Sequence, residues 1–140
     1  MATLQKRAAI YARIATIAQG SGESDFALEN QIAEARLYCQ KQGYSISEQH
    51  IYHEVFTGTQ YANRPEFTRL RDAAKGGEFD VVVVVAYSRI ARKVQLVSEF
   101  LTEMETYNVS VEAIREAFSG SAFEFFELYG RTQPGTEQEL

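Results

Sequence analysis

Five consecutive valines, Val81–Val85, lie within the run FDVVVVVA (residues 79–86) and place the strongest constraint on the fold. Valine is branched at Cβ and favours an extended backbone. Successive side chains of a strand point to opposite faces, so an unbroken apolar run requires cover on both faces. Strands of this kind are typical of the centre of a parallel sheet with helices on each side. The run therefore predicts an α/β fold.

The segments on either side of this strand alternate between strand and helix patterns. Further strands are predicted over residues 7–14, 44–56 and 109–114. Helices are predicted from a cap at Ser24 or Asp25 to Gly43, from Pro65 to Gly76-Gly77, and over residues 94–107. The first of these helices has its apolar positions at Leu28, Ile32, Ala35 and Cys39. This alternation predicts a mostly parallel sheet of four to five strands flanked by helices.

Length and composition indicate one globular domain. The chain has 140 residues, of which 45% are hydrophobic, so one sizeable core is expected over residues 1–118. A tail is expected over residues 119–140, with a short helix near residues 121–129 and disorder beyond it. No apolar run approaches the ~18 residues of a membrane span, and no leader pattern opens the chain, so a cytoplasmic location is expected. The single cysteine, Cys39, excludes an internal disulfide and is expected to pack in the core.

Four arginines follow the predicted strands at their carboxyl ends: Arg13, Arg64, Arg89 and Arg92. Ligands of parallel α/β sheets gather at this edge. The arginine side chain stays charged at any working pH, matches phosphate oxygens with its planar fork, and stabilises charge that develops during phosphoryl transfer. One helical turn would put Arg89 and Arg92 on the same side. The set predicts a phosphate site, whereas any one of these arginines alone would be interpreted as a solvated surface residue.

Other phosphate chemistries fit the sequence less well. There is no G-x-x-x-x-G-K-[ST] loop, and QGSG (residues 19–22) lacks the spacing of a dinucleotide-binding turn. No acidic cluster follows the strands, so a two-metal site is not supported. His50 and His53 are three residues apart on a predicted strand and should face opposite ways. We expect a solvated His50 and a packed or edge His53 rather than a metal pair.

Several segments together resemble the catalytic domain of the serine recombinases, the resolvase/invertase family, and most closely its large members of the phage-integrase and transposase type. The segments occur in the order YARIATIAQ, FALENQIAEARLYCQKQGY, EVFTGTQYANRPEF and FDVVVVVAYSRIAR, followed by a helix and VSVEAI. The resemblance covers residues 7–116. It implies a mostly parallel α/β sheet flanked by helices, DNA as substrate, and dimers or tetramers during recombination.

The resemblance also implies a reaction without metal or cofactor. A serine hydroxyl attacks a DNA phosphodiester, leaving a 5′-phosphoserine link and a free 3′-hydroxyl. The ester conserves the bond energy for resealing after the subunits exchange partners. The positions that match the family's functional residues are Tyr11, Arg13, Ala15, Gln19, Glu54, Arg64, Ser88, Arg89 and Arg92. Glu54 takes the place of an aspartate, and Arg13 is expected to extend from the strand to the phosphate.

Two positions depart from the family pattern. Ala15 stands where the nucleophilic serine is expected, and its methyl group cannot attack phosphorus; Ser88 replaces an aspartate. The neighbouring Thr16 is expected to point to the opposite face and not to substitute. Ala15 is either an engineered replacement that traps an inactive protein or a feature of a natural, inactive relative. The retained arginines favour the first explanation, because a cluster of like charges without its ligand is costly.

Three functions therefore stay open. The first is site-specific DNA recombination by a catalytic domain that is disabled here. The second is a non-catalytic regulatory or oligomerisation module with the same fold. The third, weaker, is a flavodoxin-like domain that binds a nucleotide near residues 19–24. The net charge of −5 and pI near 5.1 give no bulk attraction to nucleic acid, so a basic DNA-binding part is expected elsewhere and the chain is expected to be a catalytic fragment or a truncated protein.

Overall fold

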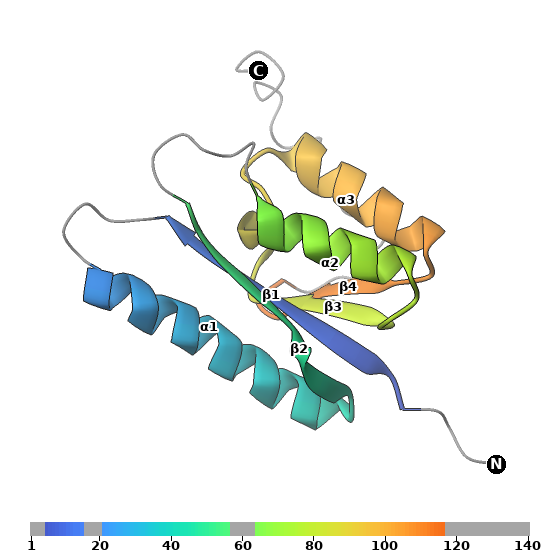
Figure 1. Ribbon diagram of the computed structural model, residues 1–140, viewed down its shortest axis with the longest axis horizontal. Coiled ribbons are helices and arrows are strands. Elements are labelled where there is room, and N and C mark those ends of the chain that lie inside the picture. The colour runs from blue at the N-terminus through green and yellow to red at the C-terminus, as the bar shows by residue number, and fades with distance from the viewer. Residues whose placement is uncertain (1–4, 16–20, 57–63, 117–140) are drawn as a thin grey trace.

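The structure, a computed structural model, describes residues 5–15, 21–56 and 64–116 (Figure 1). Within these ranges the centre is one sheet of four parallel strands in the order β2-β1-β3-β4. The strands are β1 (Arg7–Ala15), β2 (Ser45–Phe56), β3 (Val81–Val84) and β4 (Ser110–Ala113). The expected fold class and the parallel arrangement are confirmed.

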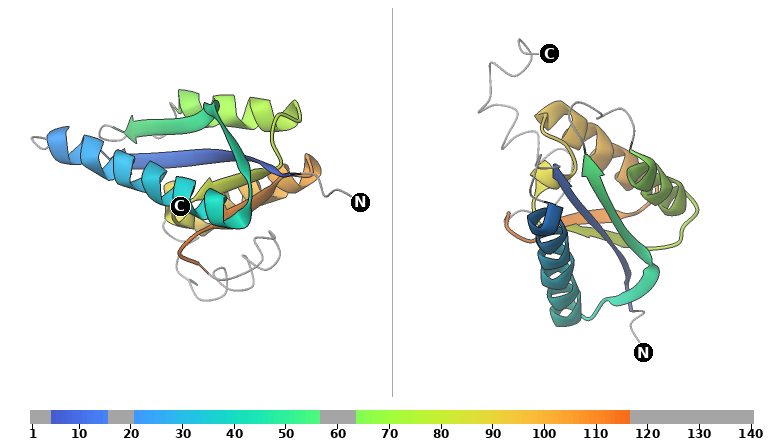
Figure 2. Two further views of the ribbon diagram at one scale, coloured as in Figure 1. Left: turned by 90° about the horizontal axis from the view of Figure 1, so that it is seen from below. Right: turned by 60° about the vertical axis from the view of Figure 1, so that its left-hand side comes forward.

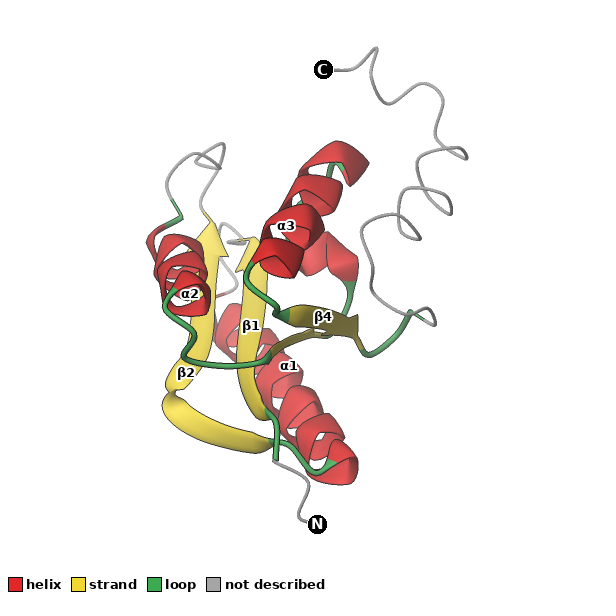
Figure 3. Ribbon diagram, turned by 90° about the vertical axis from the view of Figure 1, so that its right-hand side faces the viewer, coloured by secondary structure: helices red, strands yellow, loops and turns green. Residues whose placement is uncertain are grey.

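Three α-helices of the described ranges connect the strands: α1 (Ser21–Gln42), α2 (Pro65–Lys75) and α3 (Val94–Thr106). Figures 2 and 3 show α1 on one face of the sheet and α2 with α3 on the other. No helix in the described part of the chain is long and apolar enough to cross a membrane.

The valine strand is buried on both faces, as predicted. Val82 and Val84 pack in the larger core beneath α2 and α3, together with Leu70, Leu101 and Met104. Val81 and Val83 face the opposite way and pack against Ala35 and Cys39 of α1. All four valines of β3 are fully buried, so alternate side chains of one strand join two separate cores.

The strands differ greatly in length, and this difference positions the site. β1 pairs with β3 only from Ala8 to Ile10. On its other edge β1 pairs with β2 as far as Ala15, opposite Phe56. Among the described strands, the carboxyl half of β1 therefore has a partner on one side only, and it extends beyond the valine strand (Figure 1).

Some boundaries differ from those the sequence predicts. Helix α1 begins at Ser21, where a loop to residue 25 is predicted. Acidic residues such as Glu23 and Asp25 are favoured in the first turn of a helix. The sequence is therefore compatible with a helix that begins before residue 24 as well as with one that begins at the predicted cap. Strand β3 is shorter than the predicted residues 79–86. The tail at residues 119–140 and its predicted helix lie outside the described residues.

The expected solvation of His50 is wrong, whereas His53 lies on β2, an edge strand of the sheet, which is one of its two expected placements. His50 is buried, with an edge-on contact to the ring of Phe79 and an Nε2 atom 3.0 Å from Oε1 of Glu78, while His53 is exposed. The two do face opposite ways. Side chains alternate along a strand, so residues 50 and 53 are predicted to point to opposite faces of the sheet. The alternation does not show which of these faces the adjoining helix covers.

We expect Gly77→Ala to lower the free energy of unfolding by about 1–2 kcal/mol, the cost of a left-handed backbone in a residue with a Cβ. Gly77 has φ of 76°, and a Cβ added there would have nothing within 4 Å, so the cost is conformational alone. The adjacent Gly76 is a matched control: its φ is −79°, and an added Cβ would meet only ordinary contacts at 3.6–3.8 Å. Urea unfolding of both variants measures the difference, and equal losses at the two positions would contradict the expectation.

Candidate active site

The arginines predicted from the sequence lie near the carboxyl ends of β1, β2 and β3. A pocket of about 330 Å³ opens there, lined by three of them, Arg13, Arg64 and Arg92, with Lys93. Its apolar wall is formed by Ile90, Ala91 and Leu96. Four basic side chains from three separate segments therefore line one cavity whose surface is mostly apolar, and their charge favours an anionic ligand.

A buried network joins the strand ends to α2. The Tyr11 hydroxyl of β1 donates to Oε2 of Glu54 on β2 at 2.6 Å, and accepts from Nη2 of Arg64 at 2.8 Å. Glu54 is only 7% exposed. Its carboxylate also accepts the backbone N–H groups of Glu66 and Phe67 at 3.3 and 3.2 Å. The network therefore satisfies orphan amides at the start of α2 while it fixes Arg64 beside them.

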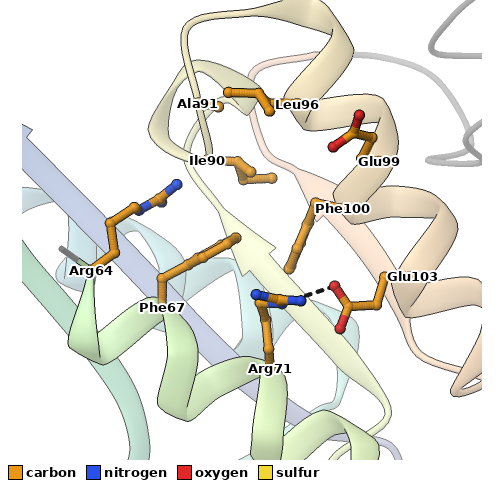
Figure 4. A pocket seen from close by; sticks show the side chains of 9 residues that line it. All are labelled: Arg64, Phe67, Arg71, Ile90, Ala91, Leu96, Glu99, Phe100 and Glu103. Atoms are coloured by element: carbon orange, nitrogen blue, oxygen red, sulfur yellow. Dashed lines mark hydrogen bonds and ion pairs between the residues drawn. The ribbon is translucent and has the colours of Figure 1, made fainter. Parts of the chain in front are cut away.

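Phe67 is a site residue that the sequence pattern did not identify. The Cζ atom of Arg64 lies 3.8 Å from the centroid of the Phe67 ring, within range of a cation–π contact. Figure 4 shows the guanidinium beside this ring, which in turn contacts Phe100 at a centroid distance of 5.0 Å. The signal was present in NRPEF, because residues three apart at the start of a helix share one side.

Arg13 and Arg89 bind each other's backbone. Arg13, 6% exposed, donates from Nε to the Arg89 carbonyl at 2.7 Å and from Nη2 to the Ser88 carbonyl at 2.6 Å. Arg89 donates from Nη1 to the Arg13 carbonyl at 3.1 Å. Arg13 was expected to extend toward a phosphate; in the structure it fastens the loop after β3 to β1 while also lining the pocket.

The helical turn predicted to align Arg89 with Arg92 is different in the structure. A short 3-10 helix, η1 (Tyr87–Arg89), ends at Arg89, and Arg92 lies in the irregular segment before α3. Arg92 lines the pocket, whereas Arg89 does not. Ser88 is exposed, and its backbone carbonyl accepts a hydrogen bond from Arg13. The sequence spacing alone did not distinguish a 3-10 turn from an α-helical one.

The structure describes less of two expected site positions, Ala15 and Gln19, than of the others. Ala15 ends β1, with its backbone in register with Phe56. Gln19 lies outside the described residues, and the alternative nucleotide site at residues 19–24 falls on residues whose side chains are not described. Within the described ranges, no three histidine, cysteine or acidic side chains gather where they could hold a metal ion.

Comparison with known proteins adds to this geometry. Residues 8–128 match the family model for the N-terminal domain of resolvase. The chain belongs to the resolvase family. A comparison with curated proteins finds no significant match.

Solved structures share the fold of this resolvase domain. The N-terminal catalytic domain of TP901-1 integrase is 19% identical with a TM-score of 0.73, and the alignment covers 96% of this chain and 100% of that one. A resolvase-family site-specific recombinase from Streptococcus pneumoniae is 22% identical with a TM-score of 0.76, covering 96% and 90%. The C-terminal catalytic domain of ISC1926 TnpA, an IS607-like serine recombinase, is 23% identical with a TM-score of 0.62, covering 87% and 79%.

A second pocket adjoins the first in the resolvase domain. It measures about 210 Å³ and extends between α2 and α3 to the ion pair of Arg71 with Glu103 (Figure 4). The two pockets share four lining residues, Arg64, Ile90, Ala91 and Leu96. Glu99 of α3, near Leu96, also lines it (Figure 4). The ion pair of Arg71 with Glu103 therefore marks the end of this pocket away from the arginine pocket (Figure 4).

Alkaline pH should destabilise the resolvase domain partly through Tyr11. Burial raises the pKa of Tyr11 well above its ordinary value near 10, and the hydrogen bond to Glu54 adds to the rise while Arg64 opposes it. Above pH 10 the tyrosine of the unfolded chain ionises while folded Tyr11 stays protonated. The free energy of unfolding should therefore fall, by about 1.4 kcal/mol for each pH unit from this residue.

The check is denaturant unfolding between pH 9 and pH 11, together with tyrosinate absorbance. The decline above pH 10 should be shallower in Tyr11→Phe than in the unmodified protein. A Tyr11 phenol that ionises near pH 10 in the folded protein, or identical pH slopes in the two proteins, would refute the expectation.

Proposed function

We propose that this resolvase domain belongs to a site-specific recombinase that cleaves and exchanges DNA strands through a 5′-phosphoserine intermediate. The observation that carries the proposal is the pocket in which Arg13, Arg64 and Arg92 converge beside the strand that ends at Ala15. Guanidinium groups hold non-bridging phosphate oxygens and stabilise the added charge of a pentacovalent transition state. Family membership supports DNA as the substrate class.

In the proposed reaction a serine at position 15 is the nucleophile. Its oxygen forms a bond to phosphorus while the bond from phosphorus to the 3′ oxygen breaks. The serine proton is lost and the 3′ oxygen gains a proton, so that a 3′-hydroxyl and a 5′-phosphoserine result. Resealing is the reverse attack by a 3′-hydroxyl, so the sequence needs no external energy source.

The described residues fall into two proposed roles. Arg64 and Arg92 contact the phosphate, with Lys93 adding positive charge to the pocket. Tyr11 and Glu54 hold Arg64 in place, and Arg13 with Arg89 holds the loop after β3 against β1. Gln19 and Ser88 are proposed to contribute by their family positions. Exchange of strands between two DNA sites needs more than one subunit, so we propose that the domain acts in a homodimer or homotetramer.

With Ala15 in place, the chain has no hydroxyl at the nucleophile position and is proposed to be inactive in cleavage. Ala15 is also the observation that favours the second candidate, a natural regulatory or oligomerisation module that keeps the fold without the chemistry. The two are separated by restoring the serine. A covalent protein–DNA adduct from the Ala15→Ser protein supports the recombinase, and its absence with DNA that carries the site argues for the module.

A further inference from the structure

A polar side chain of α1 contacts β1 at its reactive end. The side-chain amide of Gln31 meets both backbone groups of Arg13. Its Oε1 accepts the Arg13 N–H at 3.3 Å, and its Nε2 donates to the Arg13 carbonyl at 3.1 Å. A neighbouring strand would supply one acceptor and one donor in the same way.

The hydrogen bonds from Gln31 lie where β1, as far as the structure describes the chain, has lost its strand partner on one edge. β3 pairs with β1 only as far as Ile10, so at Arg13 the edge that faces away from β2 has no strand beside it within the described part of the chain. An unpaired peptide group that is partly buried costs about as much as a lost hydrogen bond. Gln31 supplies the missing partner, and Arg89 adds a second donor to the same carbonyl.

We propose that Gln31 is a positioning residue of the recombinase reaction. It replaces the absent strand partner of β1 and fixes the backbone of Arg13, and with it position 15, two residues further along the strand. The proposal rests on the proposed function, in which position 15 carries the nucleophile. Misplacement of a reacting group by about 1 Å costs on the order of 100-fold in rate, so a fixed strand end matters for the reaction.

Glutamine suits this task because one group both donates and accepts. Methionine has a similar length and shape and makes neither hydrogen bond. Gln31→Met therefore removes the two contacts with little change in volume. Gln40→Met, at an exposed position of the same helix, is the matched control.

The first test is amide hydrogen exchange in the chain as it stands. In Gln31→Met the Arg13 amide should exchange at least about 10-fold faster than in the unmodified protein, the equivalent of one hydrogen bond. The amides of β1 that pair with β3 and all amides of Gln40→Met should keep their rates. An unchanged Arg13 amide in Gln31→Met would overturn the proposed contact.

The second test measures the reaction in the Ala15→Ser protein. The probe is the set of duplexes that this protein captures covalently from digested genomic DNA. Adding Gln31→Met should slow single-turnover adduct formation at saturating DNA by about 100-fold, with the half-saturating DNA concentration changed less than about threefold. An equal rate with and without Gln31→Met would overturn the positioning role. Failure of the Ala15→Ser protein itself to form an adduct would instead refute the proposed function.

Discussion

Replacing Ala15 with serine in a full-length context is expected to give a protein that becomes covalently joined to the 5′ end of cleaved DNA, where the Ala15 protein gives none. The arginine pocket and the network behind it are already assembled in the described structure. In the proposed reaction, the attacking oxygen is the group that Ala15 does not supply. Removing a catalytic nucleophile costs many orders of magnitude in rate, so the gain should be about 10⁴-fold or more.

The measurement is a denaturing gel with end-labelled DNA, with the label shifted by bound protein and released by protease. The Ala15 protein is the control for the hydroxyl. Thr16→Ala in the Ala15→Ser background is the control for the adjacent hydroxyl and should leave the adduct unchanged. Adduct formation by the Ala15 protein, or an adduct that depends on Thr16, would contradict the assignment of position 15.

Charge reversal at Arg89 separates the recombinase from a non-catalytic module. Arg89 donates to the Arg13 carbonyl and lies in the loop that carries Arg92. In a recombinase, Arg89→Glu should abolish adduct formation in the Ala15→Ser protein. In a module whose task is self-association, binding between subunits should be indifferent to the same change, and analytical ultracentrifugation would detect that indifference.

Loss of the Glu54 carboxylate is expected to be the most destabilising change in the network. Glu54→Ala should lower the free energy of unfolding by about 3–5 kcal/mol. The change removes the hydrogen-bond acceptor of the Tyr11 hydroxyl and of two backbone N–H groups at the start of α2. It also removes the carboxylate that lies 3.9 Å from Nε of Arg64. Glu54→Gln keeps an acceptor for some of these donors and should cost less.

Urea unfolding monitored by circular dichroism measures these losses. Glu48→Ala is the matched control, since Glu48 is an exposed glutamate of the same strand with a surface ion pair to Arg36. Surface pairs of this kind contribute little, so the control should unfold almost as the unmodified protein does. Equal effects at Glu54 and Glu48 would show that the buried network does not stabilise α2 against β1 and β2.

The fold was predictable because its strongest signals are local. The valine run, the helix start at Pro65 and the spacing of Leu28, Ala35 and Cys39 depend only on neighbours along the chain, and each is confirmed. The grouping of Arg13, Arg64 and Arg92 also followed, since parallel strands bring their carboxyl ends to one edge of the sheet.

The contacts that organise the site were not predictable in the same way. The bonds from Arg13 to the carbonyls of Ser88 and Arg89 join positions 75 and 76 residues apart, and depend on strand register rather than residue type. The same holds for Gln31, whose partner is a backbone group that any residue at position 13 would present. Sequence patterns fix which residues are apolar, but they do not fix how far one strand extends past the next.

Because β1 is longer than β3, the part of β1 that packs in the core is separate from the part that ends at position 15. The first half of β1 is tied to the valine core through Ala8–Ile10, while position 15 lies past the end of that pairing. We expect exchange between serine and alanine there to change the free energy of unfolding little, because the pairing with the valine strand does not include position 15. In the proposed homodimer or homotetramer, a subunit without the hydroxyl would still join active copies, so we expect such a variant to inhibit them.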